Sequence, residues 1–365
     1  MRSASPQERS AAFGGRLPEH EPPLTLAQTI NRTLTEELAL RPEMLVLGED
    51  VAVKGGVYGV TRGLRQTFGP ARVFDTILDE QSVLGLGLGA AVSGFLPVPE
   101  IQYLAYLHNA ADQLRGEGAT LSFFSQGQYR NPMVVRIAGL GYQRGFGGHF
   151  HNDDAVAALR DIPGLVLAVP SRPDDAAAML RTCLAAARVD GTVSVFLEPI
   201  ALYHARDLLA EGDGRWLSSY APPGRWAGQH APVGSARTHG EGTDLTLVTF
   251  GNGLRMSLRV AARLAGEGVG CRVLDLRWLA PLPVEDVLRE ARETGRVLVV
   301  DETRSSGGVS EGVVTALVDH GFDGAVRRVT SRDSFIPLGP AADLVLLSEE
   351  EVLAGARALL GGVTS

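Results

Sequence analysis

Cysteine is scarce in this sequence. The 365 residues contain two, Cys183 and Cys271, which lie far apart and lack the spacing of metal ligands. Two cysteines cannot build the disulfide framework that stabilises small secreted domains, so we expect two reduced, buried thiols. Reduced thiols are typical of a reducing compartment, and we therefore predict a cytoplasmic protein.

Long apolar runs and clusters of basic residues are also missing. No stretch approaches the roughly 18 to 20 apolar residues that span a bilayer, so we expect no contact with a membrane. The formal net charge is -8, and Lys and Arg do not cluster along the chain. Because a nucleic-acid-binding surface needs clustered cations to meet the phosphates, we expect no nucleic-acid partner.

The first residues, MRSASPQERSAAFGG, contain no apolar core region of the kind that a secretory signal has. We interpret residues 1–23 as a disordered tail, because segments near a chain end are often poorly ordered.

From Thr25 onward, helix and strand patterns alternate. Thr25 and Gln28 form a capping box before an amphipathic helix, and Ser171 is a candidate N-cap for a later one. Short apolar strands are predicted at MLVLGED, PMVVRIAG, LVLAVPS and VSVFLEP. Apolar strands that alternate with helices indicate a parallel sheet covered on both faces, so we predict an α/β domain over residues 24–205.

Residues 206–242 interrupt this pattern, because they are rich in Gly, Pro and Ser and show no sustained period. We interpret them as a linker. After it, DLTLVTFG, CRVLDLR, RVLVVDE and AVRRVTS again predict buried strands separated by helices, and Ser348 is the expected N-cap of a last helix. A second parallel-sheet α/β domain is therefore predicted over residues 243–365.

The stretch DTILDEQSVLGLGLGAA allows two interpretations. Gly85, Gly87 and Ala90 match the fingerprint G-x-G-x-x-G/A of dinucleotide-binding folds, which would make the protein an NAD-dependent dehydrogenase. That fingerprint must follow a strand directly, whereas polar residues intervene here. We favour a helix over residues 80–93 whose glycines let another backbone approach closely, with Glu80 as the reactive group at its start.

A second stretch, GFGGHFHNDD, places His149 and His151 in a glycine-rich loop after an apolar strand. Imidazoles titrate near neutral pH and therefore suit proton transfer. The pair lacks a third placed ligand, so it is a weak signal for zinc, and we predict no metal site on this chain.

Several blocks occur in order along the chain, among them LGEDVAVKGGVYGVTRGLRQTFG, PVPEIQYLAYLHNAADQL, IPGLVLAVPSRPDDA, FLEPIALY, LTLVTFGNGL and VLDLRWLAPL. Through these blocks the sequence resembles, from about residue 24 to residue 360, the β subunit of the thiamine-diphosphate-dependent dehydrogenase component of 2-oxo acid dehydrogenase complexes. That group includes the pyruvate, branched-chain 2-oxo acid and acetoin enzymes. The resemblance implies a transketolase-like architecture, in which a pyrimidine-binding α/β domain precedes a transketolase C-terminal-like domain.

The resemblance also implies roles for individual residues. Glu80, the glutamate of DT-x-x-x-E, would contact the aminopyrimidine nitrogen of thiamine diphosphate and share a proton with it. Tyr106 would stack on the pyrimidine, and Gln102 in the same block would belong to the cofactor site. A loop histidine that assists proton and acyl transfer falls on His151 when counted back from PGL, and on His149 when counted from the preceding strand. We favour His151.

The same resemblance implies partners. A GDG tripeptide at Gly212–Gly214 begins the signature for Mg²⁺ and the diphosphate, but it lies in the linker and lacks the strand and the asparagine that the signature needs. We therefore expect an α subunit to bind Mg²⁺ and the diphosphate within an α₂β₂ heterotetramer. The expected reaction is oxidative decarboxylation of a 2-oxo acid with reductive acylation of a lipoyl group on the acyltransferase component. A noncatalytic scaffold subunit of such a complex is the alternative.

Overall fold

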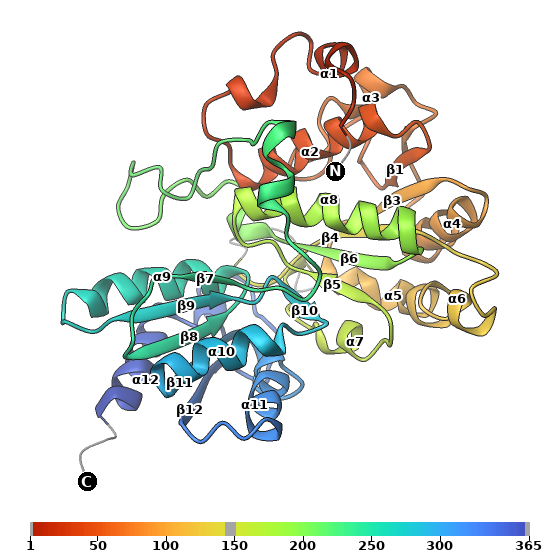
Figure 1. Ribbon diagram of the computed structural model, residues 1–365. Helices are drawn as coiled ribbons and strands as arrows, with labels where there is room; N and C mark the ends of the chain where they lie inside the picture. Colours follow the sequence, from red (N-terminus) through yellow and green to blue (C-terminus); the bar gives the residue numbers. More distant parts are fainter. Residues whose placement is uncertain (1–2, 143–150, 362–365) are drawn as a thin grey trace.

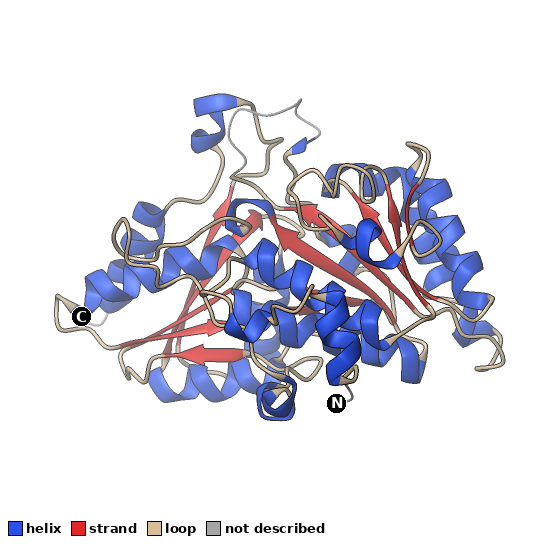
Figure 2. Ribbon diagram, turned by 90° about the horizontal axis from the view of Figure 1, so that it is seen from above, coloured by secondary structure: helices blue, strands red, loops and turns tan. Residues whose placement is uncertain are grey.

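The computed structural model describes residues 3–142 and 151–361. These residues form two α/β domains, and the first domain lies above the second in Figure 1, with the linker passing between them. In the view of Figure 2, the strands of both sheets lie between layers of helices. This confirms the predicted class of two mainly parallel-sheet α/β domains.

In the described part of the chain, the first sheet has seven strands in the order β10-β5-β6-β4-β3-β1-β2. Six of these strands come from the first domain and pair in parallel. They are β1 (Met44–Gly48), β2 (Val73–Asp75), β3 (Leu96–Ile101), β4 (Met133–Gly139), β5 (Val166–Ala168) and β6 (Val193–Pro199). All of them except β2 are buried along their whole length, as their apolar sequences predicted.

Helices cover both faces of this sheet. Val134 and Ala138 of β4 pack into the same apolar cluster as α2 and α8, whereas Val135 and Ile137 pack with α4 and α5 on the opposite face. This alternation follows the two-residue period of a strand. The helices of the domain are α1 (Pro6–Ala12), α2 (Leu26–Leu40), α3 (Leu64–Phe68), α4 (Glu80–Val92), α5 (Leu107–Asp112), α6 (Leu121–Phe124), α7 (Ala157–Arg160) and α8 (Pro173–Asp190).

The capping predictions were confirmed in two of three cases. Thr25 and Gln28 exchange both hydrogen bonds of a capping box at the start of α2, and Ser348 Oγ accepts from the backbone N–H of Glu351 in the last helix. The prediction for Ser171 was wrong, because its hydroxyl accepts from the backbone N–H of Gly251 in the second domain. Arg172 takes the N-cap position of α8 without a side-chain cap.

The expected tail over residues 1–23 is instead partly helical. Ser5 and Glu8 form a capping box that begins α1, and Arg9 is buried between two carboxylates, donating to Glu36 and to Glu19. A buried guanidinium with two carboxylate partners fixes the segment on α2, which explains why it is ordered.

The linker region also carries structure. Asp213 accepts from the backbone N–H groups of Leu208, Leu209 and Ala210, so the GDG tripeptide closes a loop. Two 3₁₀ turns follow, Pro223–Arg225 and Ala227–Gln229. Near its end, β7 (Arg237–His239) pairs antiparallel with β9 and therefore already belongs to the second sheet.

In the chain as described, the second sheet has five strands in the order β12-β11-β8-β9-β7. Besides β7 they are β8 (Leu245–Thr249), β9 (Cys271–Asp275), β11 (Arg296–Arg304) and β12 (Ala325–Ser331). The helices α9 (Asn252–Ala265), α10 (Val284–Thr294), α11 (Val309–Asp319) and α12 (Glu349–Gly361) accompany them. The prediction that β12 is buried was wrong, because it is the edge strand and most of its residues are at least partly exposed.

One strand joins the two domains. β10 (Trp278–Ala280) belongs to the second domain but pairs antiparallel with β5 at the edge of the first sheet. A backbone hydrogen bond of 2.7 Å from Val169 N–H to Arg277 C=O extends this pairing. Apolar clusters therefore run through both domains without interruption.

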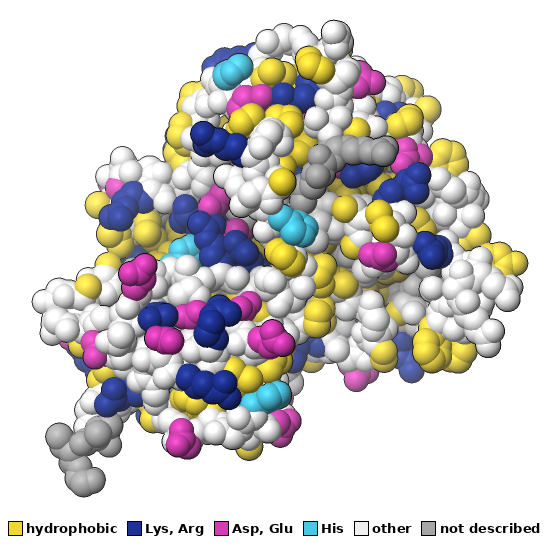
Figure 3. Space-filling view, viewed as in Figure 1, with side chains coloured by type: hydrophobic (Ala, Val, Ile, Leu, Met, Phe, Trp, Pro, Cys, Tyr) yellow, Lys and Arg dark blue, Asp and Glu magenta, His cyan; other side chains and the backbone are white. Residues whose placement is uncertain are grey.

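Two surface features complete the fold. On the face shown in Figure 3, basic and acidic side chains are interspersed over both domains. No helix in residues 3–142 and 151–361 is long and apolar enough to cross a membrane.

Candidate functional site

The residues predicted to carry chemistry gather at the carboxyl edge of the first sheet. Glu80 follows β2, Gln102 and Tyr106 follow β3, and His151 follows β4. Glu49, which was not predicted, follows β1 at the same edge. Because these strands are parallel, their carboxyl ends meet at one edge, where α/β folds bind their ligands. The five side chains line one cavity of about 540 Å³.

Glu80 is the first residue of α4. Asp79 caps this helix by accepting from the backbone N–H of Ser82 at 3.0 Å. The cap fixes the first turn of α4 and therefore the position of Glu80. Asn109 Nδ2 of α5 donates to Glu80 Oε2 at 3.1 Å. Within the described ranges, no arginine, lysine or histidine forms an ion pair with Glu80, so its carboxylate stays available to a ligand in the cavity.

Glu49 also lines the cavity and was not predicted from the sequence. It follows Gly48, whose φ of 149° and 2.7 Å approach to the Glu100 carbonyl oxygen, measured from an added Cβ, leave no room for a side chain. Burial, followed by the negative charges of Asp50 and Glu80, raises the pKa of Glu49. The signal was present in MLVLGED, which places an acid directly after a buried strand.

Gln102 lies beside Glu49. Its Nε2 is 3.4 Å from the backbone carbonyl oxygen of Glu49, so it links the ends of β1 and β3 while its side chain lines the cavity.

Tyr106 and His151 form the aromatic wall of the cavity. The Tyr106 hydroxyl lies 3.0 Å from His151 Nε2, and burial and the neighbouring Tyr103 raise the pKa of Tyr106. Tyr103 is buried, and its ring meets the His151 ring edge-on at 4.6 Å between centroids. His149, the alternative histidine, lies outside the described residues.

A buried ion-pair cluster of Arg136, Glu100 and Glu198 supports this wall through two further tyrosines. Tyr58 lies between Tyr103 and Tyr203, with ring centroids at 6.3 and 5.3 Å. The Tyr203 hydroxyl donates to Glu198 at 2.6 Å. Arg136 then holds Glu198 through two hydrogen bonds and Glu100 through a third. The bidentate hydrogen bonds of Arg136 fix the Glu198 carboxylate. Glu198 in turn fixes the hydroxyl of Tyr203, against which Tyr58 packs.

The glycines that matched a dinucleotide fingerprint lie inside α4. Gly87 faces the sheet, where an added Cβ would come within 3.0 Å of Met133 Sδ, whereas Gly85 and Gly89 face open space. Glycines in the interior of a helix do not form the strand-to-helix turn that cradles a pyrophosphate, and this excludes the NAD-binding interpretation of this stretch. The predicted helix itself is confirmed.

The site combines three chemical capacities. Glu80 can share a proton with a nitrogen base in the cavity, Tyr106 offers a ring face and a hydroxyl, and His151 can exchange a proton through Nε2. In the described part of the chain, no group of three or more His, Cys, Asp or Glu side chains is placed to hold a metal ion.

Two family models match the chain. The model for the transketolase pyrimidine-binding domain matches residues 22–204, and the model for the transketolase C-terminal domain matches residues 234–352.

Curated relatives and solved structures agree with these models. The chain is 32% identical over 345 residues to the pyruvate dehydrogenase E1 component subunit beta of Bacillus subtilis (strain 168), covering 92% of this chain and 98% of that protein. Identity and coverage are the same for the subunit of that name from Staphylococcus aureus (strain Mu50) over 346 residues. A solved split-gene transketolase, described as an inactive beta4 tetramer, shares the fold with a TM-score of 0.71, 20% identity and coverage of 93% and 99%.

Proposed function

The chain belongs to the transketolase-like family that includes the β subunits of the pyruvate dehydrogenase E1 component, and we propose that it is the β subunit of a thiamine-diphosphate-dependent 2-oxo acid dehydrogenase. Its reaction is the oxidative decarboxylation of a 2-oxo acid with reductive acylation of a lipoyl group. One observation carries this proposal: Glu80, Tyr106 and His151, which lie far apart in the sequence, line one cavity.

The residues of this cavity fit thiamine diphosphate. A carboxylate without a basic partner in the described residues suits the aminopyrimidine nitrogen, and Tyr106 offers the ring that would stack on the pyrimidine. Gln102 would close the cavity beside Glu49. When bound, the cofactor supplies the electron sink that makes loss of CO₂ possible. The diphosphate and Mg²⁺ belong to the partner α subunit in this proposal.

Each residue then has a separate task. Glu80 holds the proton that it shares with the pyrimidine nitrogen, and Asn109 orients the Glu80 carboxylate through its hydrogen bond. His151 moves a proton at Nε2 during acyl transfer, with its position fixed by Tyr106 and Tyr103.

The surface around the cavity supports a partner chain. Ile77 and Leu78 at its rim are 68% and 72% exposed. On α4, Leu86 and Val92 are exposed beside Gly85 and Gly89, both of which face open space. Contiguous exposed apolar surface is typical of a protein interface. We assign it to the α subunit of an α₂β₂ heterotetramer, with the lipoyl-bearing acyltransferase as the further partner, in the cytoplasm.

Co-purification with an α chain tests the proposal. A ferricyanide-linked assay on pyruvate, branched-chain 2-oxo acids and acetoin should show thiamine-diphosphate-dependent activity for the two chains together and none for this chain alone. Activity of the single chain would contradict a shared site. Calorimetry with NAD⁺ should give no binding heat, and a specific NAD⁺ site would favour a nicotinamide-dependent dehydrogenase.

A further inference from the structure

A second cavity lies on the other side of the aromatic wall, with a volume of about 710 Å³. Tyr58 belongs to its lining, and the Tyr58 hydroxyl lies 3.4 Å from the Tyr103 hydroxyl behind His151. The cavity is therefore a neighbour of the candidate site but is separated from it by the buried ring of Tyr103. Nothing in the function proposed above uses it.

The lining of this cavity is basic. Arg32, Arg62, Arg206 and His204 contribute to it, and no Asp or Glu is among the described residues that line it. This contrasts with the formal net charge of -8 of the whole chain. A concave surface of one sign raises the local concentration of ligands of the opposite sign.

Two of these arginines have no carboxylate partner among the described residues. Arg32 forms an ion pair with Glu21 at 3.1 Å, whereas the side chains of Arg62 and Arg206 form no hydrogen bond or ion pair within residues 3–142 and 151–361. The arginine of another cavity behaves differently, because Arg304 is paired with Asp153 and Asp154. Cationic groups that share a cavity repel one another, and an anion would relieve that repulsion.

Hydrogen bonds fix the main chain of both arginines before any ligand arrives, while their side chains are exposed. Asn31 Nδ2 donates to the carbonyl oxygens of Val60 at 2.8 Å and of Arg62 at 3.0 Å. The carbonyl oxygen of Arg206 accepts from the backbone N–H of Trp216 at 2.9 Å. Little main-chain ordering therefore opposes binding, which favours affinity.

We propose that this cavity binds a small organic molecule through its phosphate group. A phosphate monoester carries about -1.5 to -2 charges and three acceptor oxygens, which matches two guanidinium groups better than a single carboxylate does. The cavity is also larger than a phosphate ion needs, and Ala27, Val57 and the Tyr58 ring provide apolar surface for the organic part. Cavities of roughly 300–1,000 Å³ are usual for small-molecule ligands.

Calorimetry on the full chain at low salt tests this with three probes: phenyl phosphate, inorganic phosphate and benzoate. We expect phenyl phosphate to bind at least tenfold more tightly than benzoate, which carries the same ring with a carboxylate. Tighter binding of phenyl phosphate than of inorganic phosphate supports an organic phosphate as the ligand, whereas equal binding identifies the free ion and overturns the proposal of an organic ligand. Absence of phosphate binding, or benzoate binding equally well, overturns the proposal.

The double variant R62Q/R206Q should bind phenyl phosphate at least tenfold more weakly, and R62K/R206K should retain part of the affinity. R292Q/R327Q is the matched control, because both of these arginines are exposed in the second domain and it removes the same charge. Unchanged binding by R62Q/R206Q overturns the proposal. The titration is repeated on the assembly with the α chain, and loss of binding there would assign the cavity to a subunit interface and likewise overturn it.

Discussion

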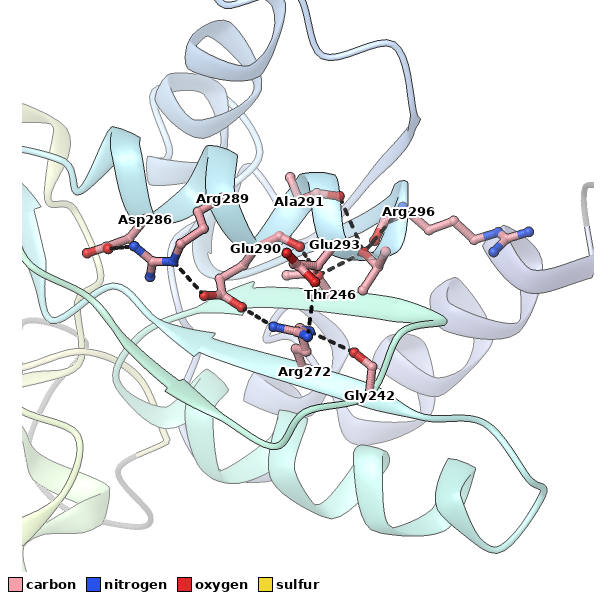
Figure 4. A network of polar contacts seen from close by, with 10 residues as sticks. Gly242, Thr246, Arg272, Asp286, Arg289, Glu290, Ala291, Glu293 and Arg296 are labelled. Atoms are coloured by element: carbon pink, nitrogen blue, oxygen red, sulfur yellow. Dashed lines mark hydrogen bonds and ion pairs between the residues drawn. The ribbon is translucent and has the colours of Figure 1, made fainter.

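Two regions of the molecule, the α10–β9 contact of the second domain and the cavity of the first, treat their acidic side chains in opposite ways. In the second domain, Glu290 accepts hydrogen bonds from Arg272 and Arg289, and Glu293 lies 3.4 Å from Arg272 (Figure 4). The two ion pairs of Arg272 fasten β9 to α10. In the first domain, Glu49 and Glu80 line the same cavity, and neither has an ion pair in the described residues. Neighbouring acids without basic partners are typical of functional sites, whereas paired acids hold elements together.

The largest expected effect comes from removing the charge of one acid from each region. With the α chain present, E80Q should lower kcat by about 10³-fold, in the range that positioned proton transfer contributes. E290Q should leave kcat unchanged per folded molecule but lower the melting temperature, because it weakens the pairing with Arg272 and Arg289. Steady-state assays and thermal unfolding of both variants measure this.

An active E80Q enzyme would remove Glu80 from the chemistry and favour a noncatalytic scaffold subunit. Equal loss of kcat in E290Q would show instead that activity follows folding in general.

The first domain also contains paired acids, in the buried cluster around Arg136. Arg136 is 1% exposed and holds both Glu100 and Glu198. R136M leaves two buried carboxylates without their cation, and loss of one partner of a buried pair costs about 3–5 kcal/mol of unfolding free energy. Urea unfolding at pH 7 measures it.

The control is R188M, because Arg188 pairs with Glu43 on the surface, where such pairs contribute about 0–1 kcal/mol. Equal midpoints of urea unfolding for R136M and wild type would contradict the view that the ion pairs of Arg136 with Glu100 and Glu198 stabilise the protein.

One acid of the second domain, Glu302, also lacks a basic partner in the described residues. Glu302 is buried and accepts from Asn252 N–H at 2.7 Å and Nδ2 at 2.6 Å. Burial raises the pKa of Glu302 to about 8, and the charges of Asp154 and Asp301 add to this effect. The folded state therefore keeps a proton that the unfolded state loses above its ordinary pKa of 4.5.

The stabilisation that follows is complete below pH 4.5 and is lost as the pH rises to about 8. Over this window the wild type should lose up to about 1.4 kcal/mol of unfolding free energy per pH unit from this group. E302Q carries no titrating proton there, so its stability relative to wild type should rise between pH 5.5 and 7.5. Urea unfolding at several pH values measures the difference, and parallel curves would show that Glu302 is charged in the folded protein.

Local sequence patterns predicted the elements well and the contacts between them poorly. The apolar runs of β4 and β6 and the helix that begins at Glu80 follow from period and capping, which depend on neighbours in the chain. The contact of Tyr106 with His151 joins residues 45 positions apart and depends on the order of the strands. Ser171 shows the same limit. Its hydroxyl was predicted to cap a helix nearby in the sequence, but it accepts a hydrogen bond from the backbone N–H of Gly251 in the second domain.

Some of the missed features had a local signal. Ser5 and Glu8 form the same kind of capping box that identified α2, and Glu49 follows a buried strand directly. Arg9 between Glu19 and Glu36 had no such signal, because its partners come from other elements.

The pairing of β10 with β5 determines how this chain could be divided. The linker suggests a natural place to cut, yet a fragment that ends there would leave β5 as an open sheet edge, with backbone donors and acceptors that β10 satisfies in the full chain. Open edges recruit strands from other molecules. The pyrimidine-binding domain expressed alone is therefore a candidate for edge-to-edge aggregation, and transferring it between proteins requires that the strand Trp278–Ala280 travel with it.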